Sequence, residues 1–263
     1  MISWTDLRTD EFAHLDPEAT VAILPVAAVE QHGPHLPVGT DAMILEGILE
    51  RIDVDPEDVK VLALPLQQIG HSPEHTGFPG TLHQEPETLL AHWTNVGRAV
   101  RRTGIRKLVI LNSHGGQVQL VDLVGQRLRQ ECGMLVVRAQ TFAFGVPDRL
   151  FDRDELRYGM HGGEVETSMM LALRPDLVRM EAAGDFASAA AEMDETFDLL
   201  GAEEPIGFAW AAQDLHPSGA TGNAALADAE RGERLLGYLA EEVATLLCDV
   251  GAFGLERLEE PPL

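Results

Sequence analysis

Three short segments of this chain combine histidine with acidic or small residues in a way that suits metal binding. The first is Glu30-Gln31-His32-Gly33-Pro34-His35-Leu36-Pro37-Val38-Gly39-Thr40-Asp41. It begins where the apolar run of residues 21–29 ends, and such polar turns carry the chemistry at the carboxyl edge of the sheet in α/β enzymes. Glu, His and Asp are ligand types that suit zinc and manganese. The segment therefore predicts a metal site, and with it a hydrolase.

The two other segments have the same character. One is Leu111-Asn112-Ser113-His114-Gly115-Gly116, and the other is Met160-His161-Gly162-Gly163-Glu164-Val165-Glu166-Thr167-Ser168. Small residues beside each His let backbone and ligand approach closely. A single His beside a turn is more often a hydrogen-bonded structural residue than a ligand. Three such segments in a doubly wound sheet would converge on one crevice, where they supply about five ligands.

A fourth polar segment, residues 69–81, is too rich in Gly and Pro for a helix or a central strand. Long loops after strands often shape functional sites. His71, Glu74 and His75 are therefore candidates for the wall of the site or for subunit contacts. The equally weighted alternative is a loop that its own polar groups anchor.

Other chemistries fit the sequence less well. Ser113 precedes His114, but the chain has no Gly-x-Ser-x-Gly elbow. Cys132 and Cys248 lie in apolar contexts, which suit buried thiols in a reducing compartment rather than reactive thiolates. No Gly-rich phosphate loop is present.

The composition limits the partners of the protein. Among 263 residues, 43 are acidic and 19 are basic, which gives a net charge of -24. This balance argues against nucleic acid and against anionic membrane surfaces as partners, because both require clustered Lys and Arg. The N-terminus lacks the pattern of a signal peptide, and no apolar run approaches the ~20 residues that span a bilayer. We expect a cytoplasmic protein.

Short apolar runs alternate with longer amphipathic segments, which predicts one α/β domain over residues 1–263 with a mostly parallel central sheet flanked by helices. An irregular stretch is expected at residues 182–217, and a surface strap or frayed end after Phe253. Strands are expected at residues 21–29, 59–66, 107–111 and 134–139, and helices at residues 42–52, 87–103, 118–132, 164–174 and 228–250.

Taken together, these motifs resemble the creatininase (creatinine amidohydrolase) family. The resemblance covers about residues 21–250 in consistent order and includes Ser72-Pro73-Glu74-His75, Gly77-Phe78-Pro79-Gly80-Thr81, Pro217-Ser218-Gly219 and Gly222-Asn223 beside the segments above. It implies an α/β fold, usually a homohexamer, and a site for two divalent ions, which are zinc, manganese or iron depending on the member.

The resemblance also implies roles for particular residues. Glu30, His32, Asp41 and His114 match metal ligands, with Asp41 as the bridging carboxylate, whereas His35 matches a position without a ligand role. Creatininase proper has a ligand Glu where this chain has Gly116. Many relatives carry it instead in the later His-x-Gly-Glu segment, so that Glu164 is preferred here over Glu166 as the fifth ligand.

The implied reaction is hydrolysis of a non-peptide C–N bond in a small, cyclic or open amide or formamide by a metal-activated water. His161 matches the acid/base histidine. Ser113, Gly115 and Gly116 are expected to bind substrate, with backbone N–H groups that hold a developing oxyanion. Creatininase proper has a Trp where this chain has Arg157, which favours an acidic or larger substrate over creatinine.

Three alternatives to this reaction remain open. The first is a peptide-processing enzyme of redox-cofactor maturation within the same family. The second is a non-catalytic oligomer that the metals brace. The third is a metal phosphoesterase, which the lack of Arg and Lys in the motif loops disfavours.

Overall fold

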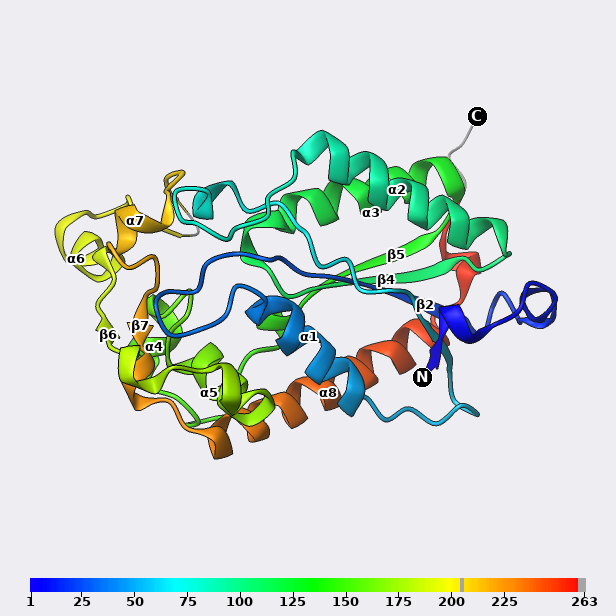
Figure 1. Cartoon of the computed structure of the whole chain (residues 1–263). Helices are drawn as coiled ribbons and strands as arrows, with labels where there is room; N and C mark the ends of the chain where they lie inside the picture. Colours follow the sequence, from blue (N-terminus) through cyan, green and yellow to red (C-terminus); the bar gives the residue numbers. More distant parts are fainter. Residues whose placement is uncertain (204–205, 260–263) are drawn as a thin grey trace.

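The computed structural model has a parallel sheet between two layers of helices (Figure 1). It describes residues 1–203 and 206–259. Neighbouring strands in the five-stranded sheet all run parallel. The order is β1-β3-β2-β4-β5, with β1 at Ile2–Ser3, β2 at Thr20–Val26, β3 at Lys60–Ala63, β4 at Lys107–Asn112 and β5 at Leu135–Gln140.

The two faces of the sheet bury different sets of apolar side chains. Along β2, Val21 and Ile23 belong to one core, and Ala22 and Leu24 belong to the other. Because both faces are covered, the strands read as continuous apolar runs rather than alternating ones. Figure 1 shows α1 (Thr40–Arg51), α5 (Glu164–Leu173) and α8 (Ala229–Ala252) on one side of the sheet, and α2 (Pro86–Arg102) and α3 (Val118–Cys132) on the other.

The five predicted helices begin and end within two residues of the expected positions. The carboxylate of Asp228 accepts the N–H of Arg231 at 2.9 Å and caps the N-terminus of α8. Pro86 occupies the first turn of α2, where its missing N–H costs nothing. Gly133, with φ of 64°, ends α3 in the left-handed conformation.

The predicted fold class, a single α/β domain with a mostly parallel central sheet flanked by helices, is confirmed. The strand expected at residues 21–29 already ends at Val26, because the next N–H, of Ala27, bonds to the carbonyl of Gln67 outside the strands. Among the described residues, no helix combines the length and apolarity that crossing a bilayer requires.

One expectation was wrong in detail. Residues 182–217 are not wholly irregular, since they contain β6 (Asp185–Phe186), α6 (Ala189–Thr196) and α7 (Ala212–Leu215). β6 pairs in antiparallel fashion with β7 (Gly222–Asn223). The helix α4 (Arg153–Tyr158) was also missed, although Asp152 caps it by accepting the N–H of Asp154 at 2.9 Å.

Short 3-10 turns complete the described chain. Of the predicted tail after Phe253, residues 260–263 lie outside the described residues. The turns are Trp4–Asp6, Glu11–His14, Pro73–His75, Gly115–Gln117, Thr141–Phe144, Pro175–Leu177, Met180–Ala182, Ala224–Leu226 and Leu255–Arg257.

Candidate metal centre

The candidate site lies at the carboxyl ends of β2 and β4. These neighbours pair in parallel up to Val26 and Asn112, so the loops that follow them leave the sheet side by side. After β2 the chain turns towards β3 on one side, whereas β4 lies on the other, which makes this the switch point of the sheet. The loop after β2 carries Glu30 and His32, and the loop after β4 carries His114.

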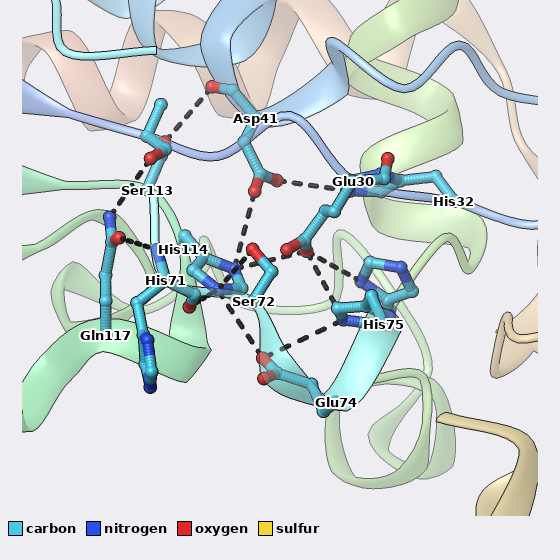
Figure 2. A network of polar contacts seen from close by, with 12 residues as sticks. Glu30, His32, Asp41, His71, Ser72, Glu74, His75, Ser113, His114 and Gln117 are labelled. Atoms are coloured by element: carbon cyan, nitrogen blue, oxygen red, sulfur yellow. Dashed lines mark hydrogen bonds and ion pairs between the residues drawn. The ribbon is translucent and has the colours of Figure 1, made fainter. Parts of the chain in front are cut away.

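Glu30, Asp41 and His114 form a first group of possible metal ligands (Figure 2). The Nδ1 atom of His114 lies 3.1 Å from Oε1 of Glu30 and 3.5 Å from Oδ2 of Asp41. Asp41 reaches this place from the first turn of α1. All three side chains are buried.

His32, Asp41 and Glu166 form a second group. The Nε2 atom of His32 lies 3.1 Å from Oδ1 of Asp41 and 3.8 Å from Oε2 of Glu166. Asp41 therefore turns one oxygen towards each group, which is the arrangement that a bridging carboxylate requires.

Backbone carbonyls orient the histidines towards the centre. Nε2 of His114 lies 2.9 Å from the carbonyl of His71, and Nδ1 of His32 lies 3.0 Å from the carbonyl of Glu30. A carbonyl only accepts, so these nitrogens carry the proton in the neutral rings. The other nitrogen of each ring, Nδ1 of His114 and Nε2 of His32, is the one that faces the carboxylates and is free to bind a cation.

The cluster has a strong demand for positive charge. Burial would lower the pKa of His32 and of His114, but the surrounding carboxylates raise both to about 10. Burial would raise the pKa of Glu30, but three histidines, led by His114, hold it well below its usual value. Burial and the charge of Glu30 raise the pKa of Asp41. A divalent cation would meet this demand without protonating the rings.

Two buried carboxylate oxygens also fit a cation. Oε2 of Glu30 and Oδ2 of Asp41 have no hydrogen-bond partner among the described residues. An unpaired buried oxygen of this kind is costly unless a cation or another donor satisfies it. The donor set of carboxylate oxygens and imidazole nitrogens suits zinc and manganese.

Glu164, the predicted fifth ligand, is not part of this geometry. Its carboxylate pairs with Nη1 of Arg231, on α8, and it belongs to none of the four candidate ligand groups among the described residues. Glu166 lies in the second group instead, where burial raises its pKa to about 7 against the opposing charge of His32. This geometry therefore favours Glu166 over Glu164 as a possible ligand beside His32 and Asp41.

His161 lies against the same cluster. Its Nε2 donates to the carbonyl of Gln31 at 2.5 Å, so the free nitrogen is Nδ1, which lies 3.7 Å from Oε1 of Glu30. Burial, followed by the charges of His32 and His75, holds the pKa of His161 well below its usual value. The ring is neutral at neutral pH and turns an acceptor nitrogen to the centre.

The carboxylate of Glu155 holds the loop that carries His161. It accepts the N–H groups of Glu164 at 2.6 Å and of Asn223 at 2.8 Å. These bonds join the segments around His161 and Thr221. The two segments run antiparallel, and the N–H of Thr221 donates to the carbonyl of His161 at 2.7 Å. Ideal Cβ atoms on Gly159, Gly163 and Gly222 would lie 2.3–2.6 Å from Oε1 of Glu155, so the glycines make room for this carboxylate.

His75, left undecided by the sequence, is inside the cluster. The amide of Gln31 is oriented by two backbone groups, since Oε1 accepts the N–H of Gly33 and Nε2 donates to the carbonyl of Gly219. Nε2 of Gln31 also lies 2.7 Å from Nδ1 of His75, so Nδ1 is the acceptor and Nε2 carries the proton. This N–H points to Oε1 of Glu30 at 3.4 Å, which makes His75 a donor to a ligand rather than a ligand.

The other uncertain histidines have structural partners. Nε2 of His35 lies 2.9 Å from the hydroxyl of Thr167, in keeping with its expected structural role. Nδ1 of His71 lies 3.0 Å from the carbonyl of Gln84. Neither belongs to a candidate ligand group among the described residues.

A cavity of about 480 Å³ opens beside the cluster. Ser113, Gly115 and His161 line it, but Gly116 does not. The hydroxyl of Ser113 donates to the carbonyl of Asp41 at 3.1 Å, which fixes this side chain. Much of the remaining wall is apolar, with Ile44, Phe142, Val146, Met160 and Leu239.

Arg157 also lines the cavity. Its side chain is 65% exposed and pairs with Asp194 of α6, while its guanidinium lies 5.3 Å from the centre of the Tyr158 ring. The charge of Arg157 is therefore already offset by a carboxylate before any substrate arrives.

Comparison with known protein families places this geometry in context. The sequence model of the family described as "Creatininase: Creatinine amidohydrolase" matches residues 5–247. Creatinine amidohydrolase of Pseudomonas putida is 30% identical over 240 residues, which cover 85% of this chain and 87% of that protein. The 3-dehydro-scyllo-inosose hydrolase of Thermotoga maritima is 26% identical over 250 residues, which cover 88% and 78%. The mycofactocin precursor peptide peptidase of Mycolicibacterium smegmatis is 31% identical over 173 residues, which cover 65% and 64%.

Solved structures share the fold. A crystal structure of creatinine amidohydrolase (creatininase) superposes with a TM-score of 0.73 at 27% identity and covers 96% of this chain and 99% of that one. A manganese form of creatininase superposes with a TM-score of 0.72 at 26% identity and covers 94% and 98%.

Proposed function

This chain belongs to the creatininase family of amidohydrolases, and from that premise we propose that it uses two divalent ions to hydrolyse a non-peptide C–N bond in a small amide or formamide. The observation that carries the proposal is Asp41, whose two oxygens face two separate ligand groups. A carboxylate shared in this way suits a pair of ions better than a single one.

The proposed ligands follow from the two groups. Glu30, Asp41 and His114 hold one ion, and His32, Asp41 and Glu166 hold the other. Glu166 takes the place that the sequence assigned to Glu164, because only Glu166 lies with His32 and Asp41. Zinc and manganese are the proposed metals, since both suit this donor set and occur in creatininase structures.

When bound, two such ions lower the pKa of a water molecule and polarise the carbonyl of the substrate. The residues of the chain supply the rest of the reaction. His161, neutral and held by the carbonyl of Gln31, would accept at Nδ1 the proton that the attacking water loses and would deliver it to the leaving nitrogen. The apolar part of the cavity wall lowers the local dielectric constant and so strengthens the electrostatic interactions beside it.

The cavity narrows the choice of substrate. Its volume of about 480 Å³ fits a small molecule. Its apolar wall suits a substrate with an apolar body beside the amide. We propose that Ser113 and Gly115 contact the reacting group of the substrate, since both line the cavity and Gly116 does not.

The test combines metal analysis with a substrate screen. The purified protein is loaded with Zn²⁺ or Mn²⁺, dialysed and analysed for metal, and then assayed with creatinine, other cyclic amides, formamides and short peptides. We expect two ions per chain and turnover of a cyclic amide or a formamide. Fewer than two ions would reject the two-ion centre. Two ions without turnover would favour the non-catalytic alternative, and cleavage of peptides alone would favour the peptide-processing one.

The expected homohexamer and the cytoplasmic location stay predictions. Size-exclusion chromatography with light scattering measures the former, and fractionation of the source cells measures the latter.

A further inference from the structure

A side chain at position 116 would first meet a carboxylate from a distant part of the chain. An ideal Cβ atom on Gly116 would lie 1.9 Å from Oε1 of Glu74 and 2.7 Å from Nε2 of His114. Glu74 thus fills the space in which a side chain at position 116 would begin. The backbone of Gly116 does not adopt a positive φ, so its missing side chain, rather than its conformational freedom, is what the structure uses.

Glu74 enters the cluster from the 3-10 turn Pro73–His75 (Figure 2). Its side chain is only 12% exposed, and Oε1 lies 3.4 Å from Nε2 of His114 and 3.9 Å from Nε2 of His75. Both of these nitrogens carry protons, as their other contacts show. Burial raises the pKa of Glu74, and the charge of His114 opposes this. The carboxylate therefore lies within ion-pair distance of both imidazoles, at the edge of the centre.

Glu74 also approaches the ligand Glu30. Oxygens of the two carboxylates and a nitrogen of His75 lie within 4.8 Å of one another. Two oxygens that share one tetrahedral ion at about 2.2 Å would be separated by about 3.6 Å. A movement of the Glu74 carboxylate towards Glu30 by up to about 1 Å would therefore let both carboxylates hold the same ion. The buried Oε2 of Glu30, which has no partner among the described residues, is a second sign that a cation belongs at this carboxylate.

We propose that Glu74 is a further metal-binding residue, which joins Glu30, Asp41 and His114 on one ion through the gap that Gly116 leaves open. This inference rests on the two-ion centre proposed above. It gives that ion a ligand from the loop between β3 and α2, in addition to those that follow β2 and β4. The loop of residues 69–81 would then supply a metal ligand, whereas a loop that only lines the site or contacts another subunit would not.

The test compares Glu74→Gln with Glu85→Gln. The first change keeps the shape of the side chain but removes its charge. The second is a matched control at a carboxylate that is 76% exposed and, among the described residues, belongs to no candidate ligand group. Metal content after dialysis and competition with a coloured chelator give the stoichiometry and the affinity of each ion. We expect Glu74→Gln to weaken one of the two ions at least about tenfold. The other ion, and both ions in Glu85→Gln, should be unchanged.

A second measurement separates a ligand from a residue that only supports His114. In the protein loaded with Co²⁺, loss of a ligand changes the visible absorption, because this depends on the coordination geometry. Addition of formate to Glu74→Ala should restore both the absorption and the affinity, since the small carboxylate fits the space left beside Gly116. An unchanged absorption in Glu74→Gln, or wild-type affinity for both ions, would overturn the inference. A wild-type protein that binds fewer than two ions would instead overturn the proposed two-ion centre.

Discussion

The imidazole rings of His75 and His161 are stacked, with their centroids 4.1 Å apart and their planes 26° apart. Burial lowers the pKa of His75 to about 4 and holds that of His161 well below its usual value. Both rings are therefore neutral at neutral pH, and each keeps its proton on a nitrogen that the hydrogen bonds define. The stack holds His161 in the orientation in which Nδ1 faces Glu30.

His161→Ala should abolish turnover but leave the metals in place. The ring supplies a proton acceptor and donor, and loss of a general acid–base group typically costs about 10²–10⁴-fold in rate. The measurement is kcat with a substrate found in the screen, together with the metal content of the same sample. A variant that loses its ions along with its activity would show that His161 is itself a ligand.

Asp41→Asn should release both ions, whereas His32→Ala should release one. The two proposed ions occupy two ligand groups. Asp41 belongs to both groups, whereas His32 belongs to only one of them. Metal content after dialysis measures the difference, with Asp10→Asn in an exposed turn as the control. Full retention of both ions in Asp41→Asn would contradict the bridging role.

Glu166→Gln should weaken metal binding more than Glu164→Gln does. Only Glu166 lies with His32 and Asp41, whereas Glu164 pairs with Arg231. Glu164→Gln should instead lower the free energy of unfolding by about 1–3 kcal/mol, because it leaves Arg231 without its buried partner. Chelator competition and denaturant unfolding of both variants separate the two effects. If Glu164→Gln weakens metal binding more than Glu166→Gln does, Glu164 rather than Glu166 is the ligand.

Acid should destabilise the metal-free protein partly through His35. Burial, followed by the charge of His32, lowers the pKa of His35 from 6.5 to about 4. A depressed folded-state pKa means that the unfolded state binds the proton more tightly, so stability is lost as the pH falls below 6.5 towards 4. The loss between pH 6.5 and about 4.5 should be on the order of 2 kcal/mol.

The measurement is thermal unfolding of the metal-free protein over this pH range, for the wild type and for His35→Gln. The glutamine does not titrate and retains a donor towards Thr167. Its unfolding temperature should fall less steeply in acid. Equal slopes for the two proteins would show that His35 does not contribute.

The part of the site that the sequence predicted best is the set of residues that follow neighbouring parallel strands. Glu30, His32 and His114 follow neighbouring strands whose carboxyl ends meet at one edge, so their convergence follows from the topology. The choice between Glu164 and Glu166 could not be made in this way. Both residues lie in the first turn of α5, and which one faces Asp41 depends on how α8 packs, because its Arg231 draws Glu164 away.

The long loop of residues 69–81 was harder to place. Nothing local shows that Glu74 returns to a gap beside Gly116, because the complementarity appears only when the two segments meet. The helices α6 and α7 were missed for a different reason. They are short and lack a long apolar stripe, so hydrophobic periodicity gives little signal.

The glycines around Glu155 constrain how this enzyme can be altered. While the carboxylate is present, substitutions at Gly159 and Gly163 fail one at a time, since each new Cβ atom meets the same oxygen. A smaller residue at position 155 would not open these sites, because a Cβ atom on Gly159 would still lie 2.7 Å from the carbonyl oxygen of Glu155, and one on Gly163 would lie 2.7 Å from that of Thr221. Gly222 is fixed by its φ of 105°. The loop around His161 therefore accepts no side chain at these three glycines, whichever residue occupies position 155, so its shape is set by backbone groups outside the cavity.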